Sequence, residues 1–170
     1  NNLYYLAYTQ SPNTTEVIDK LSKMMRYMIY ESNHPRVLLS KEIEYMENYI
    51  SLERLRLNDQ IPIDLKINGS IDGVQIVPLI FITFLENAFK HGVSNNESGS
   101  WVRISVTITN GQCIYRVENS KLASAHHEGK SGIGLQNVKR RLELSYPGNY
   151  QLQIQDLADK YSVELTLSLN

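Results

Sequence analysis

The stretch at residues 86–92, ENAFKHG, places four polar side chains at the end of an otherwise apolar run. On a helix, a spacing of four residues puts Glu86 above Lys90. The same spacing puts Asn87 above His91, so two adjacent rows of one helix face are polar. Leaving such groups buried and unpaired costs on the order of 1–3 kcal/mol each, so a ligand is one way to satisfy them.

Two interpretations of this stretch are open. The amide oxygen of Asn87 is a suitable Mg²⁺ ligand, and Lys90 supplies a point charge for phosphate. Alternatively, the stretch is an ordinary helix C-terminus, where Lys90 and His91 interact favourably with the helix dipole and Gly92 follows the last turn.

A second stretch, GIGLQN at residues 132–137, comes directly before a predicted helix. Gly132 and Gly134 allow the backbone to approach a ligand closely, and the free N–H groups of the following helix attract anions. Glycines before a helix also serve simple turns, so this motif alone is weak. The Gly-x-x-x-x-Gly-Lys-Ser/Thr pattern of a P-loop does not occur in the sequence.

Two helices are predicted ahead of these motifs. Asn13 and Glu16 have capping-box spacing and start a helix whose apolar residues recur at steps of three and four until His34-Pro35. Its stripe contains Val17, Leu21, Met24 and Met28, widened by Ile18, Met25 and Ile29. A second helix starts at Ser40 and buries Ile43, Met46, Ile50 and Leu57, with Glu42, Glu44 and Glu47 in solvent.

From residue 61 the apolar period changes to two, which indicates strands near residues 61–67, 102–108, 113–118, 150–154 and 161–169. Asn110-Gly111 predicts a tight hairpin between two of them. Helices are expected at residues 77–89 and 135–146. Hairpin strands with helices on one face predict an α+β fold, a two-layer α/β sandwich preceded by a helical segment.

Composition narrows the class of protein. The 17 basic and 18 acidic residues give a net charge of −1, so we expect no nucleic-acid partner and no membrane contact by this chain. Cys113 is the only cysteine, which excludes an internal disulfide. No apolar run reaches the roughly 18 residues that span a bilayer.

Together, the two motifs resemble those of the GHKL ATPases, in their histidine kinase branch. ENAFKHG is similar to the N box of that family, and GIGLQN followed by VKRRL is similar to its second glycine box. The resemblance is closest to the LytS-type sensor histidine kinases, which have counterparts of residues 21–31, 39–54 and 78–92. It therefore covers nearly the whole chain.

The resemblance implies a Bergerat-type ATP-binding fold and a role for each matching position. Asn87 is expected to bind Mg²⁺, with Lys90 and His91 near the phosphates of ATP. Glu86 matches the residue that acts as general base in ATP-hydrolysing relatives. In a kinase, whose acceptor is a histidine, a supporting polar role is the alternative to a general base. The glycine-box residues expected to shape or support the phosphate loop are Gly132, Gly134, Leu135 and Asn137.

The chain departs from the family pattern at two points. Asn119 occupies the position of the Asp that accepts a hydrogen bond from the adenine amino group, and the glycines that normally follow are absent. The amide of Asn119 still offers a carbonyl acceptor to adenine. None of the four histidines has the sequence context of the family's phosphoacceptor, so we expect the acceptor histidine to precede residue 1.

These observations predict the ATP-binding catalytic core of a two-component sensor histidine kinase. Residues 1–36 are expected to be the C-terminal part of the dimerisation and phosphoacceptor region, and residues 37–170 the ATP-binding domain. The resemblance implies ATP and Mg²⁺ as cofactors, a LytTR-type response regulator as partner, a homodimeric intact protein, and a cytoplasmic domain of a membrane-anchored sensor. The alternatives are a degenerate, dimerising signalling scaffold without catalysis and a GHKL-type ATPase.

Overall fold

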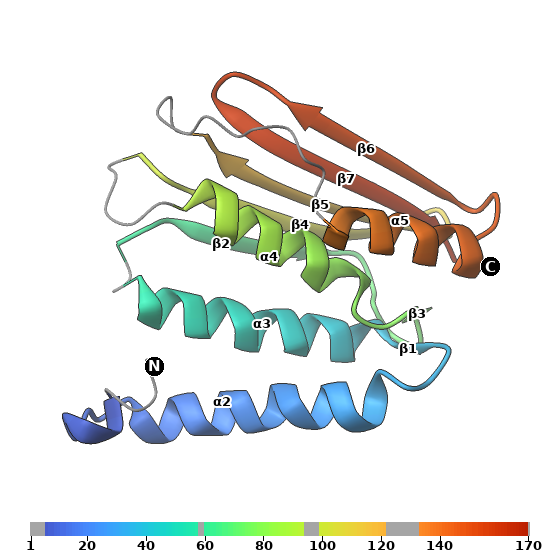
Figure 1. Ribbon diagram of the computed structural model, residues 1–170. Coiled ribbons are helices and arrows are strands. Elements are labelled where there is room, and N and C mark those ends of the chain that lie inside the picture. The colour runs from blue at the N-terminus through green and yellow to red at the C-terminus, as the bar shows by residue number, and fades with distance from the viewer. Residues whose placement is uncertain (1–5, 58–59, 94–98, 122–132, 170) are drawn as a thin grey trace.

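The computed structural model describes residues 6–57, 60–93, 99–121 and 133–169. A five-stranded sheet forms one layer, and helices on one side of it form the other (Figure 1). A further helix lies beneath that helical layer, next to α3. The predicted α+β sandwich with a preceding helical segment is confirmed.

The sheet has the strand order β2-β4-β5-β7-β6. Its strands are β2 (Ile63–Asn68), β4 (Val102–Thr109), β5 (Gln112–Ser120), β6 (Tyr150–Asp156) and β7 (Lys160–Ser168). All neighbours are antiparallel except β2, which runs parallel to β4. Asn110 (φ 49°) and Gly111 (φ 71°) form the predicted two-residue turn between β4 and β5.

Three helices form the second layer: α3 (Leu39–Arg56), α4 (Ile80–Gly92) and α5 (Ile133–Ser145). The central helix α4 contacts β4, β5 and β7, and it also packs against α3 and α5. Two further strands of two residues each, β1 (Val37–Leu38) and β3 (Gln75–Ile76), pair with each other beside these helices. The sequence did not predict this pair, because two residues are too few to show a period.

The aromatic core joins α4 to the sheet. The Tyr115 ring stacks on Phe81 with 4.3 Å between ring centroids and an interplanar angle of 9°. Its buried hydroxyl donates to the Phe81 carbonyl oxygen at 3.2 Å. The Tyr146 hydroxyl, in contrast, accepts a hydrogen bond from the Val77 N–H at 3.0 Å. Both phenols are thus buried without leaving a polar group unpaired.

The first helix differs in detail from its prediction. α2 (Thr14–Arg26) continues as a π-helical segment, Tyr27–Glu31, and packs against α3. The Asn13 side chain makes no cap hydrogen bond, so the predicted capping box is wrong. Only part of the predicted stripe is covered: Val17 and Met24 are buried, whereas Ile18, Met25, Met28 and Ile29 are exposed.

Glu42 of α3 is buried, with 1% of its surface exposed, which corrects the expectation that it lies in solvent. Its Oε1 accepts from the Leu79 N–H at 2.7 Å and from the Tyr27 hydroxyl. Leu79 precedes α4 and has a left-handed backbone (φ 56°), which costs a non-glycine residue roughly 1–2 kcal/mol. Glu42 therefore accepts a hydrogen bond from a strained residue directly before α4.

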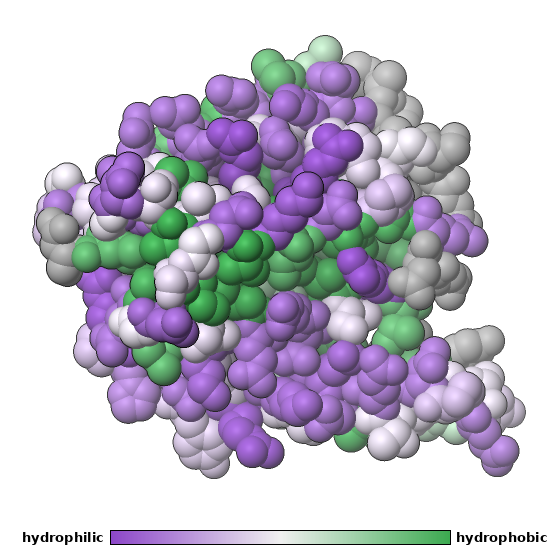
Figure 2. Space-filling model, turned by 180° about the vertical axis from the view of Figure 1, so that it is seen from behind, coloured by the Kyte–Doolittle hydropathy of each residue, from purple (hydrophilic) through white to green (hydrophobic). Residues whose placement is uncertain are grey.

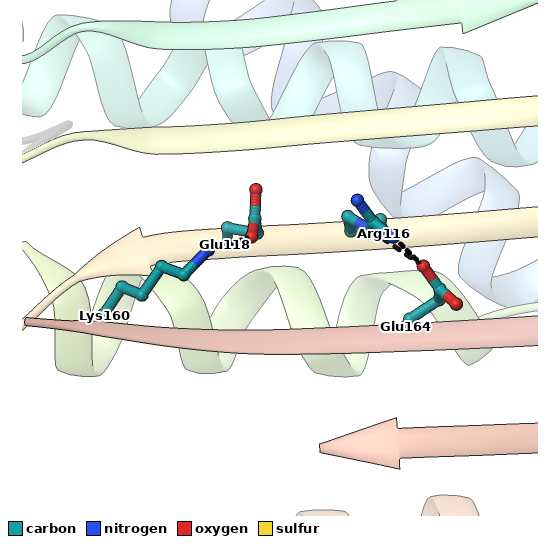
Figure 3. Close-up of polar contacts among 4 residues, drawn as sticks. All are labelled: Arg116, Glu118, Lys160 and Glu164. Carbon is teal, nitrogen blue, oxygen red and sulfur yellow. Dashed lines mark hydrogen bonds and ion pairs between the residues drawn. The ribbon is translucent and has the colours of Figure 1, made fainter. Parts of the chain in front are cut away.

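The face of the sheet away from the helices carries ion pairs across β5 and β7. Arg116 lies opposite Glu164 in the register and pairs with it, and Lys160 contacts Glu118 at 2.9 Å (Figure 3). Exposed pairs of this kind contribute about 0–1 kcal/mol each. Their value lies mainly in favouring one register of the two strands.

From behind, most of the surface is hydrophilic, with a hydrophobic band across its middle (Figure 2). A cleft of about 300 Å³ between α3 and β2 is lined by Ile50, Leu65 and Ile67 together with polar residues of α3. Within the described ranges, we find no helix with the length and apolar character needed to cross a membrane.

Candidate functional site

The polar end of α4 carries the first predicted motif. Ile80, Phe81, Phe84, Leu85, Ala88 and Phe89 are buried and fix the helix against the sheet and its neighbours. Glu86 and Lys90 are exposed on this helix, and Asn87 is half-buried. The helix extends to Gly92, so the predicted one-turn spacings between these side chains hold. His91 is helical, but its side chain lies outside the described part of the chain.

The end of α4 meets the end of β5, which brings two predicted positions together. A Cβ atom built on Gly92 would lie 2.3–2.4 Å from the Nδ2, Cβ and Cγ atoms of Asn119. Such distances are far below van der Waals contact, so only a glycine fits over the Asn119 side chain. The ENAFKHG stretch therefore ends directly against the candidate adenine acceptor.

Hydrogen bonds hold this junction in place. Asn119 is buried, and its Nδ2 donates to the Ser120 carbonyl oxygen at 2.9 Å. The Ser120 hydroxyl donates to the Gly92 carbonyl oxygen at 3.2 Å and accepts from the Trp101 N–H at 3.0 Å. Four residues, from α4, from β5 and from the position directly before β4, thus share one network. The sequence missed the part played by Ser120, since a serine at the end of a strand gives no signal of its own.

The second motif lies beside the first on α5. A Cβ atom on Gly134 would lie 3.7 Å from Cγ2 of Thr83, which is one helical turn before Asn87. Leu135 is half-buried and packs on the core, and Asn137 is exposed. Gly132 lies outside the described residues.

The carboxyl of Glu86 lies toward α3, near Tyr45 and Glu53, rather than at the junction of Gly92 with Asn119. The residue is exposed as a whole, but partial burial of its carboxyl raises its pKa, and the neighbouring Glu53 raises it further. Glu86 in turn contributes to raising the pKa of Tyr45, to about 12, after the larger effect of burial. A carboxyl with a raised pKa is a better proton acceptor than an ordinary glutamate.

The donor set on α4 is compatible with a Mg²⁺ ion that arrives with a nucleotide. Such an ion takes most of its ligands from phosphate oxygens and water and needs only one or two from the protein. Asn87 offers one half-buried amide oxygen, and Lys90 lies on the next turn. Among the residues described, no three or more His, Cys, Asp and Glu side chains gather into a metal site.

Comparison with known proteins yields both family and structural matches. The family model described as Histidine kinase matches residues 1–61, which contain α2 and α3. The sensor histidine kinase/phosphatase LytS of Staphylococcus aureus (strain MRSA252) is 27% identical over 168 residues, covering 91% of this chain and 29% of the relative. The chain thus spans less than a third of the length of the curated relatives it matches.

Solved structures share the fold at low sequence identity. The catalytic domain of histidine kinase ThkA has a TM-score of 0.60 at 12% identity, covering 79% of this chain and 94% of that one. ThkA in complex with the response regulator protein TrrA has a TM-score of 0.59 at 10% identity, covering 92% of this chain and 49% of that one.

The fold is that of a histidine kinase catalytic domain, and the matches support the histidine kinases as the class of this chain. Within that class they support the LytS-type sensor histidine kinases. The resemblance predicted from the two motifs is therefore confirmed at the level of the family.

Proposed function

We propose that this chain is the ATP-binding catalytic core of a two-component sensor histidine kinase, which transfers the γ-phosphoryl group of ATP to a histidine outside the chain. One observation carries the proposal: only a glycine at position 92 fits over Asn119, so the helix that carries Asn87, the candidate magnesium ligand, ends against the candidate adenine acceptor. The start of α5 packs beside the same helix at Thr83, and N–H groups at the start of a helix attract phosphate.

Each residue has a task in this proposal. Asn87 holds Mg²⁺ through its amide oxygen, while Lys90 and His91 approach the phosphates. Bound Mg²⁺ neutralises phosphate charge and helps to align the transferred group. Asn119 accepts from the adenine amino group, and Glu86 accepts or orients the proton of the incoming nucleophile. The phosphate loop is formed or supported by Gly132, Gly134, Leu135 and Asn137.

The remaining features of the proposal concern the intact protein. Residues 1–36 form the end of the dimerisation and phosphoacceptor region, and residues 37–170 form the ATP-binding domain. The exposed Met25 and Ile29 on the outer face of the first helices are available to a second copy in a homodimer. A LytTR-type response regulator accepts the phosphoryl group, in line with the ThkA complex, and this segment lies on the cytoplasmic side of a membrane-anchored sensor.

A calorimetric titration with Mg-ATP tests the proposal. We expect saturable binding to the wild type and loss of at least about tenfold in affinity in Asn87→Ala, because one ligand of the metal is removed. Asn48→Ala is the matched control, since Asn48 is also half-buried on a helix but lies on α3. Absence of binding by the wild type would refute the nucleotide site and favour the signalling scaffold.

A GHKL-type ATPase is the second candidate, because the raised pKa of Glu86 suits a general base. A phosphate-release assay on this chain separates the two functions. Steady turnover that Glu86→Gln abolishes would support hydrolysis. Binding of Mg-ATP without turnover would support the kinase core, whose acceptor is a histidine.

A further inference from the structure

The start of the site helix α4 is held by two side chains, Glu42 of α3 and Tyr146 directly after α5. The Val77 N–H donates to the Tyr146 hydroxyl at 3.0 Å, and the Leu79 N–H donates to Glu42 Oε1 at 2.7 Å. Leu79 is the N-cap residue of α4, whose N–H has no partner within the helix, and Val77 lies two residues earlier, so outside acceptors hold the chain where the helix begins. The left-handed backbone of Leu79 marks this start as strained and dependent on its surroundings.

The same two side chains also contact the chain before β1, one in the helical segment and one in the connection that follows it. The Tyr27 hydroxyl donates to the Glu42 oxygen that Leu79 uses. The guanidinium of Arg36 lies 4.2 Å above the centre of the Tyr146 ring and donates to the Ser145 carbonyl oxygen at 3.2 Å. Among the described residues, the Tyr27–Glu42 bond is the only hydrogen bond or ion pair from residues 14–31 to later elements.

We propose that Glu42 and Tyr146 are positioning residues that couple the segment before residue 37, which comprises the helical residues 14–31 and the connection that contains Arg36, to the site helix. Each contacts that segment through one partner, Tyr27 or Arg36, and fixes one N–H at the start of α4. Because α4 is continuous from Ile80 to Gly92, a shift of its first turn is carried to its polar end. That this end binds nucleotide rests on the proposed function; the coupling itself does not.

The burial of Glu42 makes this contact sensitive to the loss of one partner. Its Oε2 has no hydrogen-bond partner among the described residues, so Oε1 makes the bonds that offset burial of the carboxyl. Removing the Tyr27 hydroxyl leaves the buried group with the Leu79 N–H alone. The resulting cost falls on both the docking of α2 and the start of α4.

Hydrogen exchange followed by mass spectrometry on this chain tests the coupling in Tyr27→Phe. We expect exchange to accelerate about tenfold in residues 14–31 and also in residues 83–88 of α4, as the loss of one hydrogen bond to a buried carboxyl predicts. Tyr45→Phe is the matched control. Its ring lies 5.0 Å from that of Tyr27 and is similarly buried, but its hydroxyl makes no hydrogen bond among the described residues.

Acceleration confined to residues 14–31, or equal acceleration in Tyr45→Phe, would overturn the proposal. Glu42→Gln is the rescue variant: it keeps an oxygen for both donors, so residues 83–88 should exchange within about twofold of the wild type, whereas Glu42→Ala should not. Mg-ATP titrations of the same proteins keep the two proposals apart. If the wild type binds no nucleotide, the proposed function fails while the exchange comparison still decides the coupling.

Discussion

Gly92→Ala tests the junction between α4 and β5 directly. The new methyl carbon would lie 2.3–2.4 Å from three atoms of the Asn119 side chain, which is itself buried and hydrogen-bonded. The Asn119 side chain or the end of α4 must move by more than 1 Å to restore ordinary contact. Movement of the Asn119 side chain disturbs its bond to the Ser120 carbonyl, and movement of the end of α4 disturbs the bond from the Ser120 hydroxyl to the Gly92 carbonyl.

The magnitude follows from these contacts. Overpacking a buried site costs about 1–3 kcal/mol, and each hydrogen bond lost adds about 0.5–1.5 kcal/mol. The φ of Gly92 is not positive, so alanine recovers about 0.4–1 kcal/mol through the entropy of the unfolded chain. We therefore expect the free energy of unfolding to fall by about 1–3 kcal/mol.

The assay is urea unfolding followed by the fluorescence of Trp101, the only tryptophan, whose backbone N–H donates to the Ser120 hydroxyl. Gly134→Ala is the matched control, because among the residues that the structure describes its methyl carbon would meet only Thr83, at 3.7 Å. Alanine at this helical position should raise stability by up to about 1 kcal/mol. If Gly92→Ala keeps both wild-type stability and Mg-ATP affinity, or if the two variants lose stability equally, the packing argument is wrong.

Two further predictions concern buried ionisable groups. Burial raises the pKa of Glu42, against the lowering effects of Tyr27, the Leu79 N–H and Arg141, so the folded state binds its proton more tightly than the unfolded state. The stability from this proton is complete below the ordinary pKa of 4.5 and is lost as pH rises through the raised pKa. In urea unfolding, Glu42→Gln should therefore gain stability relative to the wild type as pH rises across that range. A difference in stability that stays constant with pH would contradict this. Burial also raises the pKa of the Cys113 thiol to about 12, so a thiol reagent at neutral pH should modify it only after unfolding, and rapid labelling of the native protein would contradict its placement in the core.

The strands and the site helix could be predicted from sequence because their apolar periods are regular. Residues 102–108 alternate strictly, and Asn110-Gly111 permits one tight turn, so β4, β5 and their register follow from local rules. The stretch ENAFKHG was placed correctly on α4 for a similar reason: a polar end on a buried helix is visible in the sequence.

Contacts between distant elements were not predictable in this way. A glutamate between Lys41 and Glu44 is predicted from composition to lie at the surface, yet Glu42 is buried and is bonded by two donors from other parts of the chain, Tyr27 and Leu79. The need for glycine at position 92 likewise depends on Asn119, which is 27 residues away. The capping box failed because Asn13 and Glu16 have the required spacing, but Asn13 has helical backbone angles.

The parallel pairing of β2 with β4 has a consequence for the order in which the chain folds. β4 with β5 and β6 with β7 are joined by short turns, so these hairpins need little chain entropy to close. β2 precedes α4 in the chain but must pair beside β4, which places over thirty residues between partners. We expect the sheet to assemble from the two hairpins and to be completed when β2 pairs with β4. Pulse-labelled hydrogen exchange during refolding measures this order, because β2 should become protected last.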